Sequence, residues 1–160
     1  KSSIFSITFS LFVIGVIASI FFKRILWGVL AVIPLTSAVI INFGFMGYFG
    51  IELSHITAIL SSIIIGVGVD FAIHYIAQFR RLSRTVNQDE LSREVVDDVG
   101  YPIILDAASN MGFGALLFSS FLPIQYIGGL MVFAMVSTSL GTLTVLSALA
   151  ELLKKKLVEK

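Results

Sequence analysis

The 160-residue sequence contains no cysteine and little charge, and both absences restrict what the protein can be. Without cysteine the chain can form neither a disulfide framework nor a thiolate metal site. Charged residues make up only 13% of the chain, whereas soluble domains carry about 25%. Hydrophobic residues reach 57%. This composition argues against a water-soluble protein and favours a membrane protein.

The charge is missing from whole stretches of the chain. Residues 2–22, 25–51 and 107–150 contain no Asp, Glu, Lys or Arg. A helix crosses the roughly 30 Å hydrocarbon core of a membrane with about 20 apolar residues, so the first stretch fits one crossing. The last stretch would make about 66 Å of continuous helix, so it must fold back. Leu122-Pro123 offers the break, because proline lacks an amide donor and disfavours helix in the residue before it.

We therefore predict an all-α fold, a polytopic membrane helix bundle that forms a single transmembrane domain over residues 1–160. About five transmembrane helices are expected, at about 3–22, 25–43, 54–78, 100–121 and 125–151. The segment 44–54 is rich in glycine and aromatic residues, which is typical of a turn at the membrane interface, and Ser54 is a candidate cap for the third span.

The loop before the fourth span has its own helical pattern. Asn87 and Glu90 have the spacing of a capping box. An apolar stripe follows, made of Leu91, Val95, Val96 and Val99. Gly100 and Pro102 are expected to end this segment. We predict a short amphipathic cytoplasmic helix at about 88–99, which serves either as a connector between spans or as a regulatory docking site.

The basic residues predict the orientation in the membrane. In a five-span threading, ten of the eleven lie on one side: Lys23, Arg24, Arg80, Arg81, Arg84, Arg93, Lys154, Lys155, Lys156 and Lys160. Loops rich in Lys and Arg stay in the cytoplasm. We therefore expect a multi-pass protein of the cell inner (plasma) membrane with its basic loops in the cytoplasm and Lys1 outside.

The first residue is not methionine, and the chain enters a span almost at once. No small-residue cleavage site follows that span, so a signal peptide is not expected. We expect the chain to be a segment of a longer protein.

Asp70 is the most informative residue, because it lies near the middle of the third span. An ionised carboxylate there costs at least about 2.5–3.5 kcal/mol on insertion scales, and no Lys or Arg lies inside any predicted span to offset that cost. Such an acid takes up and releases a proton when its hydration changes, as a proton-coupled machine requires. A structural acid that holds helices together by hydrogen bonds is the alternative.

Asp70 shares one helix face with Ser62, Gly66 and His74, each four residues from the next. Small residues on such a face allow another helix to approach closely, so Ser62, Gly66 and Gly68 are predicted to serve helix packing. The Gly66–Gly68 pair is no dinucleotide loop, because no strand precedes it. His74 either relays protons or reaches toward the inner interface.

The fourth span adds Asp106, Ser109 and Asn110 at a depth that matches His74 and Asp70. A shared polar layer follows, in which Asp106 and Asn110 face the same way at i and i+4. We predict a proton relay made of Asp70, Asp106, His74 and Asn110. For Asp106, a hydrogen-bonded structural role stays open. Gly112 and Gly114 are read as helix-packing residues.

Other chemistries receive no support from the sequence. The two histidines, His55 and His74, lie in opposite halves of one predicted helix, too far apart to share a metal ion. No serine lies in the sequence pattern of a nucleophile elbow. The basic residues lie at the ends of the predicted spans, which membrane topology explains without a nucleic-acid partner. We therefore expect no enzyme, no metal, no cofactor and no nucleic-acid partner.

Two motifs resemble a known family. Gly66-Val67-Gly68-Val69-Asp70-Phe71 resembles the Gly-x-Gly-x-Asp-Tyr motif in the fourth helix of each half of resistance-nodulation-division (RND) exporters of the mycobacterial membrane protein large (MMPL) type. The run 112–120 with Pro123-Ile124 resembles their fifth and sixth helices. Together the motifs cover about 60–150. Sterol-sensing domains and accessory subunits of the Sec translocon share this topology.

The resemblance implies one transmembrane half of a proton-coupled exporter of lipids or hydrophobic small molecules, with Asp70 as the proton carrier. Its expected partners are the lipid bilayer, a hydrophobic substrate, and the missing remainder of the transporter or a second copy. Two departures stand out: Phe71 replaces the motif's tyrosine, and Asp106 stands where a small residue is expected. The alternative function is a sterol-sensing-like module that binds or senses lipids without transport.

Overall fold

The computed structural model describes residues 2–52 and 55–158, and all regular structure in these two ranges is helical. The α-helices are α1 (Ser2–Phe21), α2 (Ile25–Tyr48), α3 (His55–Leu82), α4 (Leu91–Asn110), α5 (Leu122–Gly141) and α6 (Ser147–Val158). A 3₁₀ helix, η1 (Met111–Phe118), continues α4. Four helical segments are long and apolar enough to cross a membrane, and Phe5–Phe21 is a shorter apolar helix. The predicted all-α membrane bundle is confirmed.

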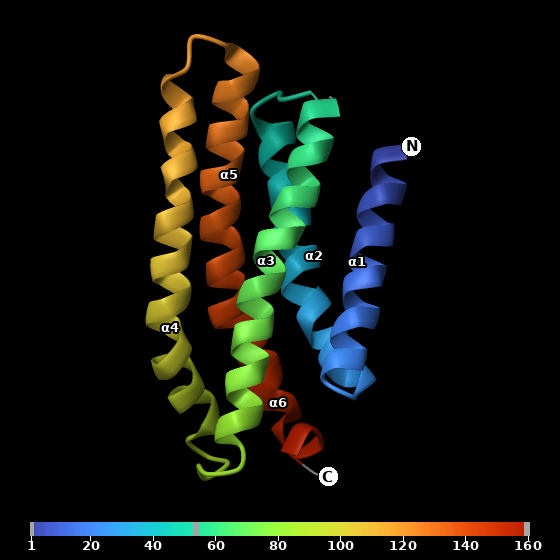
Figure 1. Ribbon diagram of the computed structural model, residues 1–160, viewed down its shortest axis with the longest axis vertical. Helices are drawn as coiled ribbons and strands as arrows, with labels where there is room; N and C mark the ends of the chain where they lie inside the picture. Colours follow the sequence, from blue (N-terminus) through green and yellow to red (C-terminus); the bar gives the residue numbers. More distant parts are fainter. Residues whose placement is uncertain (1, 53–54, 159–160) are drawn as a thin grey trace.

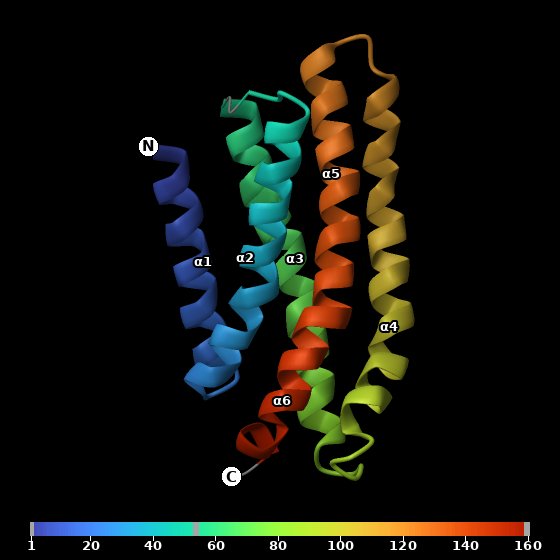
Figure 2. The ribbon, with the colours of Figure 1, turned by 180° about the vertical axis from the view of Figure 1, so that it is seen from behind.

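The helices run side by side along the long axis of the molecule (Figure 1, Figure 2). α4 with η1 and α5 form a hairpin on one flank, α1 lies on the opposite flank, and α2 and α3 lie between them. The hairpin turns just before Leu122-Pro123, with proline in the first turn of α5, as the sequence predicted. The α4–η1 segment is the least buried of the four candidate spans: 11% of its apolar stretch is buried, against 44% in each of the other three.

The basic residues gather at one end of the bundle, which we call the basic end. Arg80 and Arg81 lie in the last turn of α3, next to the α3–α4 loop, and Lys155 and Lys156 lie in the last turn of α6. The Arg24 guanidinium, from the α1–α2 turn, donates hydrogen bonds to the carbonyls of Lys156 (3.2 Å) and Leu157 (3.4 Å). Arg24 thus caps α6 and brings the first loop to the same end. The cytoplasmic location of this end stays a prediction.

α2 is longer than the sequence suggested. The interfacial turn was expected from Gly44 onward, but α2 continues to Tyr48. Met46 is buried, and the Phe45 ring stacks on Phe133 of α5 with centroids 4.1 Å apart, so packing extends the helix. Gly50, just beyond the end of α2, has a φ of +65°, and the Ile51 amide donates to the Met46 carbonyl at 2.9 Å. Ser54 lies outside the described residues.

The separate amphipathic helix at 88–99 was a wrong prediction. α4 begins at Leu91 and runs without interruption through Gly100 and Pro102 to Asn110. The reason is a continuous apolar stripe at a spacing of four, formed by Leu91, Val95, Val99, Ile103 and Ala107, all buried. Burial of this stripe outweighs the hydrogen bond that Pro102 removes, as occurs in other membrane helices. The predicted capping box is also wrong, because the cap residue is Glu90 and no side chain caps the helix.

α5 and α6 form one path, joined by a π-helical turn, η2 (Thr142–Leu146). A π turn adds one residue to a regular α-helix. Thr142 and Leu146, at the two ends of the turn, are both buried. Beyond this turn, α6 directs Glu151 and Lys154 toward the start of α4.

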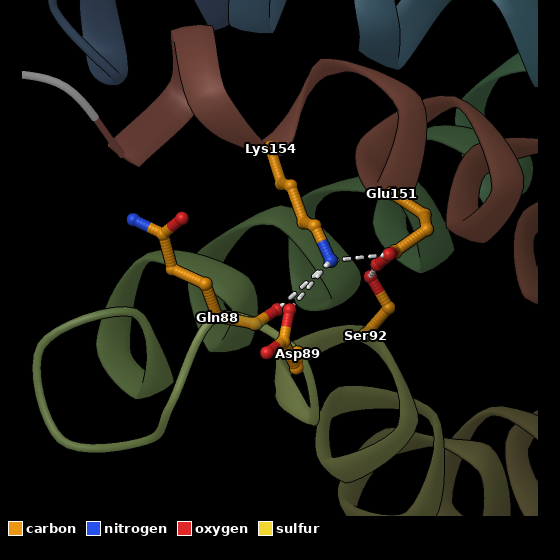
Figure 3. A network of polar contacts seen from close by, with 5 residues as sticks. All are labelled: Gln88, Asp89, Ser92, Glu151 and Lys154. Atoms are coloured by element: carbon orange, nitrogen blue, oxygen red, sulfur yellow. Dashed lines mark hydrogen bonds and ion pairs between the residues drawn. The ribbon is translucent and has the colours of Figure 1, made fainter.

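A polar network at the basic end ties α6 to the α3–α4 loop and to α4 (Figure 3). The Lys154 ammonium lies between the Glu151 carboxylate (2.5 Å) and the Asp89 carboxylate (3.8 Å), and it donates to the Gln88 carbonyl at 3.2 Å. The Ser92 hydroxyl donates to Glu151 at 2.5 Å. The Lys154 side chain is only 18% exposed, so its contacts are more persistent than those of a free surface lysine.

Lys154→Ala should therefore loosen the loop at 83–90. With the ammonium removed, the Gln88 carbonyl and the Asp89 carboxylate lose their contact with α6, and we expect a protease to cut the loop about two- to fivefold faster. Limited proteolysis of the protein in detergent measures this rate. Lys155→Ala is the matched control, since Lys155 is exposed and adjacent. Equal cleavage of the two variants would show that the network does not hold the loop.

Candidate functional site

A groove between α3 and α4 opens on the outer surface of the bundle. We call it the α3–α4 groove, and its volume is about 390 Å³. It is lined by Phe71, His74, Ala77, Gln78 and Arg81 of α3 and by Asp98, Val99, Pro102, Ile103 and Asp106 of α4. Phe71 and Ile103 are buried and give the groove an apolar wall. Half of the lining side chains are polar, which is unusual for a surface between two membrane helices.

The mouth of the groove lies near the basic end. There the Gln78 amide donates a hydrogen bond of 2.6 Å to the Asp98 carboxylate, across the gap between α3 and α4. Arg81 lies one turn further toward the end of α3 and lines the same groove. The mouth is therefore polar on both sides and carries both signs of charge.

Deeper in the groove lie His74 and Asp106, one from each helix. The Asn110 amide donates to the Asp106 carboxylate (3.3 Å) and to the Asp106 carbonyl (3.0 Å) from one turn along α4. Asp106 and Asn110 thus face the same way. Among the described residues, Asp106 forms no ion pair. The ion pairs that these residues do form lie near the basic end.

Asp70 lies outside the groove but on the same exposed face of α3, one turn beyond His74. Within the part of the chain that the structure describes, no hydrogen bond or ion pair engages the side chains of Asp70 or His74. The face points away from the rest of the bundle. The structure therefore brings His74, Asp106 and Asn110 together and places Asp70 beside them.

The depth of the two acids follows from the bond at the mouth. Gln78 and Asp98 are in contact and so lie at one level. Asp70 is eight residues from Gln78, and Asp106 is eight residues from Asp98, in antiparallel helices. At 1.5 Å per residue, both carboxylates lie about 12 Å from this level along the helix axes, away from the basic end. Two acids from different helices thus share one level, as the predicted polar layer requires.

The small residues predicted to pack divide into two groups. A side chain at Gly68 would meet Leu35 of α2 and Thr138 of α5, and one at Gly114 would meet Val132 of α5. No heavy atom lies within 4 Å of the corresponding position at Gly66 or Gly112, and Ser62 is exposed. The packing predicted for Gly66, Gly112 and Ser62 is therefore not made within the described chain.

Sequence reasoning missed Gln78, Arg81 and Asp98 as part of this site. Asp98 falls in the separate amphipathic helix that was predicted at about 88–99, and Gln78 only marked the end of the predicted span at 54–78. A signal was present, because Asp98, Pro102, Asp106 and Asn110 follow one another at a spacing of four. The expectation of a helix end at Gly100 concealed this stripe.

A family model matches residues 20–154, and its description is the sterol-sensing domain of SREBP cleavage-activation. The match covers most of the chain and includes the whole α3–α4 groove. The chain belongs to the sterol-sensing domain family.

This family is found in RND- and MMPL-like membrane proteins, in agreement with the topology that the sequence suggested. The chain is also similar to a membrane protein of Methanocaldococcus jannaschii, with 28% identity over 153 residues. That similarity covers 93% of this chain but 39% of the relative, so the chain spans less than half of the relative's length. No solved structure matches the chain.

Proposed function

We propose that this sterol-sensing domain is the transmembrane half of a proton-coupled RND-type exporter, of the MMPL type, in the plasma membrane. Its basic end faces the cytoplasm and its substrates are lipids or other hydrophobic molecules. The observation that carries the proposal is the pair of acids, Asp70 and Asp106, at one level on an outward face of α3 and α4. Both can bind a proton, and no basic side chain among the described residues neutralises either.

The free energy of a carboxyl group in a membrane depends strongly on whether it carries a proton. An ionised Asp in hydrocarbon costs about 2.5–3.5 kcal/mol or more, whereas the protonated acid is far less costly. When the two carboxyl groups are ionised, the α3–α4 face is more stable in contact with water. When they are protonated, the face can pack against another helix. This coupling between a proton and helix packing is what drives an exporter.

The exposed face also explains the partner that we propose. Ser62, Gly66, Asp70 and His74 form a stripe that the described part of this chain leaves exposed. The relative from Methanocaldococcus jannaschii is more than twice as long as the matched region. We propose that the remainder of the transporter, or a second copy, covers this stripe, because open space at Gly66 permits close approach of a helix.

A lipid-sensing module without transport is the second candidate, and the family match favours it. In that function the α3–α4 groove, with its apolar wall of Phe71 and Ile103, binds a lipid, and the acids set the polarity of the site.

Transport driven by protons separates the two candidates. With the intact protein in lipid vesicles, an imposed pH gradient should drive the movement of a fluorescent lipid between leaflets, and a proton ionophore should stop that movement. A pH-sensitive dye inside the vesicles should report the accompanying proton flux. Lipid binding without movement or flux would favour the sensing module. Movement that continues unchanged with the ionophore would refute proton coupling.

A further inference from the structure

The α3–α4 groove combines a polar mouth with titratable side chains at its deep end. Gln78, Arg81 and Asp98 lie at the mouth, and His74 and Asp106 lie deeper in the groove. All five side chains have donors or acceptors for hydrogen bonds with water. The groove is thus a polar path of about 12 Å from the basic end to Asp106.

Lipid chains would fill this groove at a high energetic cost. At the deep end an apolar occupant would hold the Asp106 carboxylate against hydrocarbon, which costs about 2.5–3.5 kcal/mol or more for a charged group, and at the mouth it would displace water from Arg81 and Asp98. Its volume of about 390 Å³ has room for on the order of ten water molecules. Water satisfies all of these groups at once, whereas an apolar occupant satisfies none.

We propose that the α3–α4 groove is a water-filled vestibule that connects the basic end with Asp106 and His74, and that its ligand is the hydrated proton. The role of protons rests on the proposed function, whereas the hydration of the groove does not. In the transfer, an O–H bond of hydronium breaks and one forms on the Asp106 carboxylate, which leaves a water molecule. His74 lines the same vestibule and lies one turn from Asp70. It therefore links the vestibule to the exposed stripe that contains Asp70.

The absence of cysteine in the chain makes the vestibule directly testable. Asp106→Cys places a thiol at the deep end, and Leu105→Cys places one at the neighbouring position, which is 53% exposed but does not line the groove. The probe is a charged, membrane-impermeant methanethiosulfonate, added to vesicles that expose the basic end. Any cysteines outside this chain are replaced by serine. We expect Asp106→Cys to react at least about tenfold faster than Leu105→Cys, since only a hydrated thiol ionises and reacts.

His74→Cys provides a second probe at the other wall of the groove, in case Asp106→Cys does not fold. It should also react from the basic end and not from the opposite side. Reaction at the same rate as Leu105→Cys, or reaction only from the opposite side, would overturn the vestibule. Because labelling requires no transport, a vestibule that labels as expected in a protein without proton-driven transport would refute the proposed function alone.

Discussion

Asp70→Asn in the intact protein should reduce export by about a hundredfold or more while the protein still inserts and folds. Asparagine has the shape of aspartate but cannot bind and release a proton, and a positioned proton-transfer group contributes about a hundredfold or more to its reaction. Within the described residues, no hydrogen bond or ion pair engages the Asp70 carboxylate, so the substitution removes no contact that stabilises the fold. Export of a fluorescent lipid, beside the amount of protein in the membrane, measures both effects.

Asp97→Asn is the matched control for this substitution. Asp97 is exposed at the basic end and forms one surface ion pair with Arg93, at 3.9 Å, which contributes little to stability. The control should export normally. If Asp70→Asn also exports normally, Asp70 is not the proton carrier. If Asp70→Asn leaves lipid binding intact and the parent protein shows no proton flux, the sensing module is the better description.

Gly28→Ala should destabilise the protein more than the same substitution at any other glycine of this chain. α1 and α2 approach so closely that a Cβ at Gly28 would overlap the Ser19 hydroxyl and the Gly15 carbonyl. The carbonyl belongs to the backbone of α1, and the Ser19 hydroxyl is itself hydrogen-bonded to it at 2.6 Å. The hydroxyl can rotate away only by losing this hydrogen bond, and the carbonyl cannot move without displacing α1. Such overpacking typically costs about 1–3 kcal/mol, and thermal unfolding in detergent should show a lower midpoint.

Gly44→Ala lies on the same helix and makes the same chemical change. No heavy atom lies within 4 Å of a Cβ at Gly44, and alanine favours helix over glycine by about 1 kcal/mol in exposed helices. We expect this control to be neutral or slightly stabilising. An equal loss of stability in both variants would mean that helix propensity, and not the contact between α1 and α2, sets the effect.

The architecture of the bundle was accessible from the sequence because the bilayer restricts it so strongly. Stretches without charge must become helices, and Leu122-Pro123 is where such a stretch can break. The side-chain direction of Asp106 and Asn110 was also predictable, since i and i+4 always share a helix face.

What could not be predicted was decided by tertiary packing. Gly100 and Pro102 are local signals for a helix end, yet burial of Val99, Ile103 and Ala107 carries α4 through them. The hydrogen bond between Gln78 and Asp98 depends on how α3 and α4 cross, which no local pattern encodes. In the same way, the sequence placed Asp70 in the membrane interior but gave no indication of whether it would face the bundle or its outer surface.

The π turn at Thr142–Leu146 affects how this chain should be aligned with other sequences. One added residue rotates everything after it by about 100° relative to a regular helix. A homologue with an ordinary helix at this point would need a one-residue gap there to keep counterparts of Glu151 and Lys154 directed at α4. An alignment without that gap would equate Glu151 with a residue on another side of the helix. It would then not show whether the homologue has the contacts that hold α6 against α4.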